Sequence, residues 1–544
     1  MKKITSLILS IAIFLSITAS AQTVKLTPAE KKLAEAITAA QIKNYLYFVA
    51  SDAMGGRDTP SQGLDVTAEF LKMNLEKWGF KPAGDNGTFF QKITLRRESV
   101  DPGKTWLKMD GKSFALGDDF LRLRGNGTAA GEVVFVGDGW LVKSKGLNPY
   151  QGIDVKGKFL LISAKGLSQA TIAPRPAGVT PADLSGTKGV DWADPVEYAR
   201  QNQAAGILVI PPEQFFANWA QIKNFLGRSA MYPEKLRSNP GPGSELPIIM
   251  LGQSAASALL TDNSLKAPAA LGKQLEISLS TKADTATTQN VVALWEGSDP
   301  VLKQEMVAIG AHYDHVGTNP NAPGEDKIWN GADDDGSGTV AVLSIAEALA
   351  KAKIRPKRSV LFVWHCGEEK GLWGSEYFNK YPTVDIKNVI AQLNIDMIGR
   401  SLDPAKLIKC DMPNRPCNEE LSGPNEIYVI GKDMMSSELG RIVDQTNQAY
   451  LNLKYNTRYD DPNDKNRFFF RSDHFNYAQN GIPIAFWFDG VHEDYHQPSD
   501  SPDKIDYAKM EKVTRTIFLT LWELTNVASR PKVDKQLPPE LTQR

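Results

Sequence analysis

The stretch from residue 311 to residue 338 constrains the fold most strongly. It follows an apolar run at residues 306–310, which predicts a buried strand, and it precedes a run at 339–346, which predicts a helix. The strand end carries His312, Asp314 and His315, and the helix entrance carries three consecutive aspartates, residues 333–335. Ligands of open α/β sheets bind just beyond the carboxyl ends of strands. Adjacent carboxylates resist burial, so a multivalent cation would hold them together, although aspartates before a helix are also ordinary N-caps.

The N-terminus has the pattern of a secretory signal peptide. Lys2 and Lys3 precede a mostly apolar segment, and small residues end at Ala21, so we expect cleavage after Ala21. No later segment reaches the length of a membrane span. These features predict a secreted or periplasmic protein. The net charge of −1 gives no reason to expect nucleic acid as a partner.

Three cysteines cannot all pair. Cys410 and Cys417 flank a short loop, and an oxidising compartment would permit a disulfide between them. We interpret Cys366, at an apolar strand end, as a buried thiol.

Hydrophobic patterning divides the rest of the chain into an α/β part and an insertion. Three helices are expected between residues 28 and 78, and the glycine-rich loop at 50–58 between them is interpreted as a plain connection. Short β-type runs without histidine or cysteine then predict a β-rich inserted domain. After it, strands alternate with helices, which predicts an α/β layered sheet. The expected divisions are a signal peptide at 1–21, the N-terminal part of the α/β domain at 22–113, the insertion at 114–285, the main α/β domain at 286–530, and a short polar tail at 531–544.

Acidic and histidine residues follow four strands of the α/β part. His312 and Asp334 follow the first strand, the pair Glu368 and Glu369 follows the run at 360–365, and Asp396 ends the run at 389–395. A fourth group, residues 493–498, follows the run at 484–488 and includes His496. These strand ends converge in space if the strands share one sheet, so we expect the groups to meet.

Two neighbouring cations need one bridging carboxylate and end ligands of histidine and acid types. That set is available in His312, Asp334, Glu369, Asp396 and His496. A further carboxylate without a metal should accept the proton of the attacking water, and one glutamate of the adjacent pair suits this role. Asp314, two residues from His312, can orient its imidazole.

These motifs resemble the metallopeptidase M28 family, the co-catalytic zinc aminopeptidases. The matching segments are AHYDH at 311–315, GADDDGSG at 331–338, GEEKGLWGS at 367–375, NIDMIG at 394–399, RSDH at 471–474 and DYHQPSD at 494–500. The insertion is similar, more loosely, to a protease-associated (PA) domain through residues 155–158 and 203–206. The resemblance implies a zinc exopeptidase-like α/β fold, with a mixed central sheet and helices on both faces.

The resemblance also implies roles for single residues. Asp334 would bridge two zinc ions per chain, Glu369 and His496 would complete one site, and His312 and Asp396 the other. Glu368 would be the general base and later the acid that protonates the leaving amine. The metals would polarise the scissile carbonyl and lower the pKa of the bridging water to about 7.

One residue departs from the family pattern, and several others have alternative roles. Some family members place a tyrosine three residues before the Ser-Asp pair as an oxyanion donor, whereas this chain has Phe469. Arg471, Ser472, Asp473 and His474 are expected either near the pocket or as residues that hold the loop. The remaining histidines have plain interpretations, as a loop residue (His315), a strand residue (His365) and a surface residue (His492).

The predicted function is therefore a zinc metallo-exopeptidase acting on peptides, foremost an aminopeptidase. A carboxypeptidase would need a cationic clamp for the substrate carboxylate, for which Arg471 or Arg400 is available. A glutaminyl cyclase on the same scaffold would use a single zinc, and a binding protein of this fold need hold none. Loops 318–329 and 401–422 are expected to shape the pocket. Oligomeric state is left open.

Overall fold

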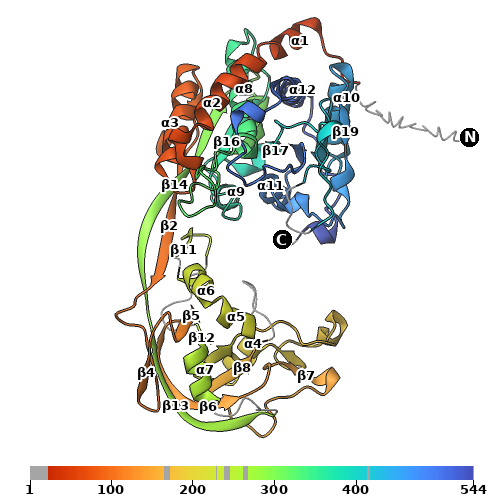
Figure 1. The fold of residues 1–544 in the computed structure, drawn as a ribbon. Helices are drawn as coiled ribbons and strands as arrows, with labels where there is room; N and C mark the ends of the chain where they lie inside the picture. The colour runs from red at the N-terminus through yellow and green to blue at the C-terminus, as the bar shows by residue number, and fades with distance from the viewer. Residues whose placement is uncertain are drawn as a thin grey trace, which may run out of the picture. The chain divides into compact units, whose positions relative to one another are not determined.

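The computed structural model describes residues 23–164, 172–227, 229–237, 245–260, 267–412 and 417–542, so the expected signal peptide lies outside the described residues. The chain forms two compact units (Figure 1): one joins the residues up to Lys92 to Thr288–Arg544, and the other spans Ile93–Thr287. The second unit therefore starts at Ile93 and not at residue 114. The reason is that strands β3 (Trp106–Met109) and β4 (Lys112–Phe114) pair within its sheet.

A mixed sheet forms the centre of the first unit. Strands β15 (Met306–His312), β16 (Ser359–His365), β17 (Val389–Ile395) and β20 (Ile484–Phe488) run parallel to one another. The antiparallel strands β14 (Thr281–Trp295) and β18 (Glu426–Ile430) flank them. The short strands β19 (Lys454–Asn456) and β1 (Lys81–Pro82) pair with β18 and β14, and β2 (Phe90–Val100) and β11 (Ala230–Pro233) extend the sheet beyond β14. Because four strands are parallel, their carboxyl ends lie at the same edge.

Helices cover both faces of this sheet. Every residue of β15, β16, β17 and β20 is buried, as expected when successive side chains point to opposite covered faces. Helices α8 (Gly338–Lys351) and α12 (Tyr507–Asn526) pack on β15, whereas α11 (His474–Gln479) packs on β17 and β20 and α9 (Trp373–Lys380) packs on β16. Figure 1 shows these two pairs on opposite sides of the sheet. The predicted fold class is confirmed for this unit.

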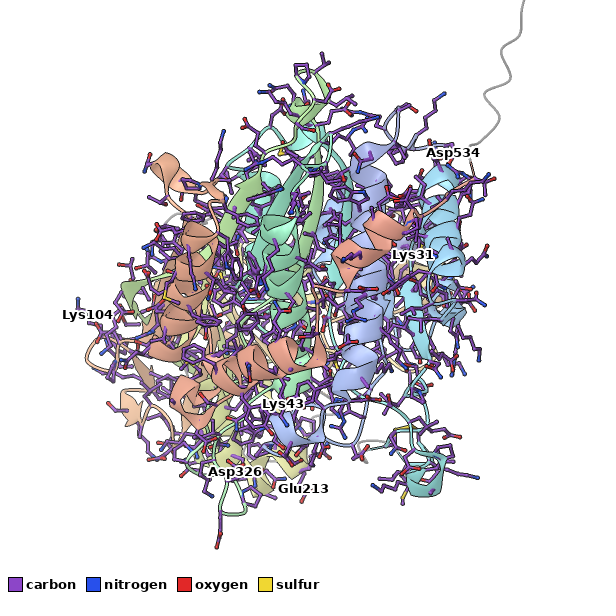
Figure 2. All side chains as sticks on the ribbon, turned by 90° about the horizontal axis from the view of Figure 1, so that it is seen from above. Lys31, Lys43, Lys104, Glu213, Asp326 and Asp534 are labelled. Carbon is purple, nitrogen blue, oxygen red and sulfur yellow. A yellow bond between two sulfur atoms is a disulfide. The ribbon has the colours of Figure 1, made fainter. Side chains whose placement is uncertain are left out.

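The N-terminal helices form an outer layer over α8 and α12. Helices α1 (Pro28–Ala34) and α2 (Ala39–Val49) pack on both of them, and α3 (Gln62–Lys77) follows the glycine-rich loop. Thr27 and Glu30 form a capping box at the start of α1. Their outer faces carry charged side chains such as Lys31 and Lys43 (Figure 2). Helix α10 (Ser437–Ala449) packs on α12.

The second unit has its own eight-stranded sheet. Its four central strands, parallel to one another, are those that the apolar runs predict: β6 (Gly127–Phe135), β8 (Phe159–Ser163), β10 (Gly206–Ile210) and β12 (Ile248–Leu251). The antiparallel strands are β5 (Phe120–Arg124) and β13 (Ala269–Leu279), with β3 and β4 beyond β13, and β7 (Leu141–Val142) pairs with β9 (Trp192–Ala193) separately. The helices of this unit are α4 (Pro195–Gln201), α5 (Glu213–Ala217), α6 (Trp219–Leu226) and α7 (Gln253–Leu259).

The C-terminal segment packs onto the first unit. Leu541 is only 2% exposed and belongs to the apolar cluster that contains Phe469. Cys410 and Cys417 form a disulfide, and Cys366 is buried with a free thiol. Among the described residues, no helix combines the length and apolarity needed to cross a membrane.

Candidate metal centre

Histidine and carboxylate side chains from the four parallel strands converge at one edge of the sheet. One group contains His312, Asp334 and Asp396, and a second contains His315, Asp334, Glu369 and His496, with potential ligand atoms within 4.8 Å of one another in each. Asp334 belongs to both groups. The five residues selected from the sequence are therefore neighbours, and His315 joins them.

His312 ends β15 and points its Nε2 into the first group. This atom lies 3.3 Å from Asp334 Oδ1 and 3.6 Å from Asp396 Oδ2, and Glu368 Oε2 lies 3.9 Å away. Burial alone would lower the pKa of His312, but the carboxylates of Asp396 and Glu368 raise it well above its usual value. The ring is thus surrounded by more negative charge than it can neutralise.

Asp314 contacts this imidazole differently from what we expected. Its backbone carbonyl lies 3.2 Å from His312 Nδ1, whereas its carboxylate Oδ1 lies 3.7 Å away. That carboxylate instead accepts the backbone N–H of Glu368 at 3.2 Å. Asp314 therefore links the loop after β15 to the loop after β16, and its carbonyl orients the ring.

The carboxylates of the three consecutive aspartates contact different groups. Asp335 accepts the backbone N–H groups of His312, Gly338 and Met397. Asp333 accepts the N–H of Gly399. Only the middle residue, Asp334, turns both carboxylate oxygens to the histidines. Of these bonds, only the one from Gly338 to Asp335 lies at the start of α8, so Asp333 and Asp335 mainly hold the segments around the site, whereas Asp334 has the arrangement that the metal interpretation predicts.

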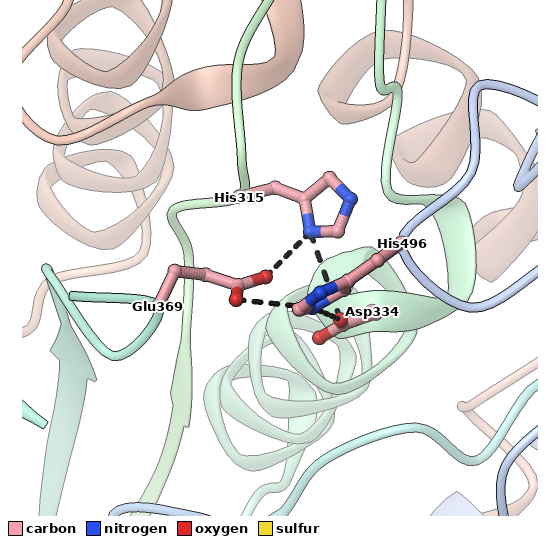
Figure 3. A group of neighbouring side chains, drawn as sticks. All are labelled: His315, Asp334, Glu369 and His496. Atoms are coloured by element: carbon pink, nitrogen blue, oxygen red, sulfur yellow. Dashed lines mark ion pairs between the residues drawn. The ribbon is translucent and has the colours of Figure 1, made fainter. Parts of the chain in front are cut away.

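The second group lies beside the first (Figure 3). His496 Nε2 is 3.0 Å from both Asp334 Oδ2 and Glu369 Oε2, and His315 Nδ1 is 2.8 Å from Glu369 Oε1. Burial would lower the pKa of His496, but the adjacent carboxylates of Asp334 and Glu369 raise it to about 10. Burial would also raise the pKa of Asp334, yet its histidine partners hold it well below the usual range.

Several buried atoms of these groups have no hydrogen-bond partner among the described residues. They are His312 Nε2, His315 Nδ1, Asp334 Oδ2, Glu369 Oε1 and His496 Nε2. Leaving buried polar atoms unpaired costs about 1–3 kcal/mol each. Imidazole nitrogens and carboxylate oxygens are the donors that zinc accepts in proteins, so the donor set fits that metal.

A cavity of about 270 Å³ opens next to both groups. His312, Asp334, Glu368, Glu369 and Asp396 form its polar wall. Its other side is mostly apolar and aromatic, with Met397, Phe468, Phe486, Phe488, Val491 and Tyr495, and Arg471 also lines it. The guanidinium of Arg471 lies 4.9 Å from the Phe468 ring and donates to the Tyr495 hydroxyl at 3.2 Å.

Residues 290–521 match the model of peptidase family M28. All the residues of the two groups fall inside this match. This part of the chain is an M28 peptidase domain.

Relatives of known name match part of this chain. Leupeptin-inactivating enzyme 1 of Streptomyces exfoliatus is 28% identical over 244 residues, which is 44% of this chain and 44% of that protein. A probable leucine aminopeptidase of Arthroderma benhamiae is 28% identical over 41% of this chain and 56% of its own length. The chain thus spans about half the length of the curated relatives it matches. A solved aminopeptidase from Aneurinibacillus sp. strain AM-1 aligns over 93% of this chain and 98% of its own, at 17% identity and a TM-score of 0.49.

The other candidate residues of the M28 domain take different places. Ser472, Asp473 and His474 are fully buried and do not line the cavity, whereas the exposed Arg471 does. Ser472 hydrogen-bonds the Asp396 carboxylate, and its hydroxyl accepts Asn394 Nδ2 at 2.8 Å. Of the two interpretations, loop support describes these three residues better.

One histidine interpretation is wrong, and two hold. His492 is 1% exposed and pairs with Asp333 at 3.1 Å, so it is not a surface residue. His315 does lie in a loop, but its ring is buried in the second group. His365 is a buried residue of β16, as expected.

The glycine-rich loop at 50–58 is more than a connection. Arg57 is fully buried and donates to the backbone carbonyls of Val49, Tyr313, Asn330 and Gly331 at 2.7–3.0 Å. Tyr313 follows His312, and Gly331 precedes the aspartates. Arg57 therefore ties together the two loops that carry the metal-binding candidates. A lone arginine after two glycines gave no signal of this role in the sequence.

Proposed function

We propose that this protein is a zinc aminopeptidase that removes N-terminal residues from peptides outside the cytoplasm. The observation that carries the proposal is Asp334, which faces both histidine–carboxylate groups while Glu368 lies beside them at the cavity. The relatives named as leucine aminopeptidases support it.

In this proposal, His312, Asp334 and Asp396 hold one zinc ion, and Glu369, His496 and Asp334 hold the other. Two bound zinc ions would polarise the scissile carbonyl and lower the pKa of a water to about 7. Glu368 has no zinc to hold and faces the cavity, so it accepts the proton of that water and then passes it to the leaving amine. Burial, then Glu369 and Asp396, raise the pKa of Glu368 well above its usual value, which suits a group that must hold a proton in mid-reaction.

The cavity wall suggests which N-terminal residues are accepted. Phe468, Phe486 and Phe488 offer an apolar surface next to the proposed zinc ions. A leucine-like side chain buried there gains roughly 1.5–3 kcal/mol relative to water. We therefore infer a preference for large apolar N-terminal residues.

The cellular location of the protein and the type of its second unit complete the proposal. We infer that residues 1–21 are a signal peptide cleaved after Ala21, which places the enzyme in the periplasm or outside the cell. We assign the second unit, Ile93–Thr287, to a PA-like domain on the motifs at 155–158 and 203–206. No described helix is suited to crossing a membrane.

Carboxypeptidase activity is the second candidate, because a cation lines the cavity. Arg400 is unsuited to the clamp, since its side chain is mostly buried and pairs with Asp494 at 2.9 Å. Arg471 is exposed and lines the cavity, so it can contact a substrate carboxylate.

Peptides blocked at one end separate these activities. Mature protein from Gln22, supplied with zinc, would be offered a leucine-starting peptide that is free, N-acetylated or C-amidated. The proposal predicts equal release of leucine from the free and amidated peptides and none from the acetylated one. Loss of cleavage on amidation would instead establish a carboxypeptidase, and ring closure without hydrolysis of a glutamine-starting peptide, offered in parallel, would establish a cyclase.

A further inference from the structure

His315 occupies a position that its plain interpretation as a loop residue does not explain. It lies three residues beyond the end of β15, and its side chain is completely buried. Figure 3 shows its imidazole pointing at Glu369, Asp334 and His496. Its Nδ1 lies 2.8 Å from Glu369 Oε1 and 3.7 Å from Asp334 Oδ2. The His496 ring lies 5.5 Å away, centroid to centroid.

The atoms that meet at this point are unpaired. Neither ring nitrogen of His315 has a hydrogen-bond partner among the described residues, although Nδ1 is close to a carboxylate oxygen. The same holds for Glu369 Oε1, Asp334 Oδ2 and His496 Nε2. Buried polar atoms in folded proteins are normally paired. Four donors from four segments that face one another without hydrogen-bond geometry have the composition of a cation site.

The chain is also built to hold His315 in this place. Its backbone N–H donates to the carbonyl of Arg57 at 3.1 Å, and the Arg57 side chain holds Tyr313 on the other side of Asp314. Gly331 makes room for the ring: it has φ +56°, and a Cβ there would lie 2.5 Å from His315 Cγ. The imidazole could not occupy this position if residue 331 had a side chain.

We propose that His315 is a further metal ligand, through Nδ1, of the ion held by Asp334, Glu369 and His496. This inference rests on the proposed function. It makes the two sites unequal, because the group with His315 offers four protein donors and the group with His312 offers three. A tetrahedral site with four protein ligands is closed, and one with three keeps a free position. The free position then lies in the group with His312, the one next to Glu368.

A hydrogen bond from His315 to Glu369 is the alternative, and it would also strengthen metal binding. Affinity alone therefore cannot separate the two roles, since loss of such a supporting bond costs 10- to 100-fold in affinity. A count of the coordinated imidazoles can separate them. Cobalt(II) in the zinc sites shifts the ring N–H protons of directly bound histidines far outside the normal proton NMR range, and these protons exchange with D₂O.

The experiment loads the metal-free full-length mature protein with two equivalents of Co²⁺ and counts these exchangeable shifted signals. The inference predicts three in the wild type, from His312, His315 and His496, and two in His315→Asn. The asparagine amide keeps a hydrogen-bond donor near Glu369 but is a poor ligand. His365→Asn is the matched control, because it removes an equally buried imidazole outside both groups and should keep three signals.

Titration of the metal-free protein with Zn²⁺ gives a second readout. We expect two binding events of different affinity in the wild type, and His315→Asn should weaken the tighter one by at least about 100-fold, beyond what a lost supporting bond costs. Two shifted signals in the wild type would overturn the inference and leave the proposed function intact. Failure of the wild type to bind either metal would overturn both. The wild-type count decides the matter even if the variant does not fold.

Discussion

At the scale of single residues, Glu368 and Glu369 are chain neighbours with opposite surroundings. Glu369 contacts the imidazoles of His315 and His496, and these outweigh burial and lower its pKa. Glu368 faces the cavity, and burial raises its pKa. Two adjacent residues thus supply different groups: the carboxylate of Glu369 suits cation binding, and the carboxyl group of Glu368 suits proton transfer.

Replacing Glu368 by glutamine tests this division of roles. Because Glu368 belongs to neither candidate metal group, Glu368→Gln should bind zinc as the wild type does and lose about 10²- to 10⁴-fold in kcat. Zinc content and the rate of leucine release from a peptide are the two measurements. Glu376→Gln, on α9 and paired with Lys380, is the control and should keep its rate. A Glu368→Gln enzyme of near-normal rate would show that another group accepts the proton.

Site residues at strand ends could be predicted from the sequence, whereas site residues placed by the folding of loops could not. His312, Glu369 and Asp396 could be selected because each lies at or shortly after the end of an apolar strand, and parallel strands bring their ends together. The burial of His315 and His492 depends on how their loops fold back, which no periodicity records. Phe468, Phe486 and Val491 lie outside the listed motifs, so the apolar cavity wall emerges only in three dimensions.

At the scale of elements, the glycine-rich loop is the support of the candidate centre. Its 3₁₀ segment, η1 (Asp52–Arg57), has three successive residues in the left-handed region, at φ +53°, +68° and +47°. The carbonyl of Gly56 accepts the backbone N–H of Gly317 at 3.0 Å, and the carbonyl of Gly317 accepts the backbone N–H of Trp329. The indole N–H of Trp329 in turn donates to the carbonyl of His496 at 2.9 Å. The loop therefore reaches both candidate metal groups through backbone contacts.

Two neighbouring glycines of this loop provide a matched pair of variants. A Cβ on Gly56 would lie 2.3 Å from the carbonyl oxygen of Gly317 and 2.6 Å from that of Trp329, whereas a Cβ on Gly55 meets nothing within 4 Å. Gly55→Ala should cost only the left-handed strain of about 1–2 kcal/mol. Gly56→Ala should cost more in the free energy of unfolding and also weaken zinc binding, because the backbone must move. Equal losses in denaturant unfolding and in zinc affinity for the two variants would contradict the supporting role.

The elements themselves were predictable where patterns are strong. The parallel strands β15, β16, β17 and β20 are short apolar runs, and their helices have clear apolar periodicity. The first half of strand β14, which begins at Thr281, could not be predicted, because it reads Thr-Lys-Ala-Asp-Thr-Ala-Thr-Thr and lacks an apolar signal. Strands β3 and β4 are short and form a local hairpin, which joins the sheet only because β3 pairs with the distant strand β13.

At the scale of the whole molecule, the chain leaves the unit that contains the M28 domain within β2 and returns within β14. Both strands run continuously through the division, so composition marks the boundary poorly and the sequence placed it at residue 114. The expected polar tail likewise proves to pack through Leu541. Such contacts join residues far apart in the sequence, and local patterns do not report them.

The central claim is that two histidine–carboxylate groups joined by Asp334 hold zinc for peptide hydrolysis. The most direct measurement is the zinc content per chain of purified mature protein, compared with that of Asp334→Ala. We predict two zinc ions in the wild type and fewer than one in the variant, together with loss of leucine release, because the substitution removes the one side chain that both groups share. A wild type without zinc, or an Asp334→Ala protein that retains two ions, would contradict the account.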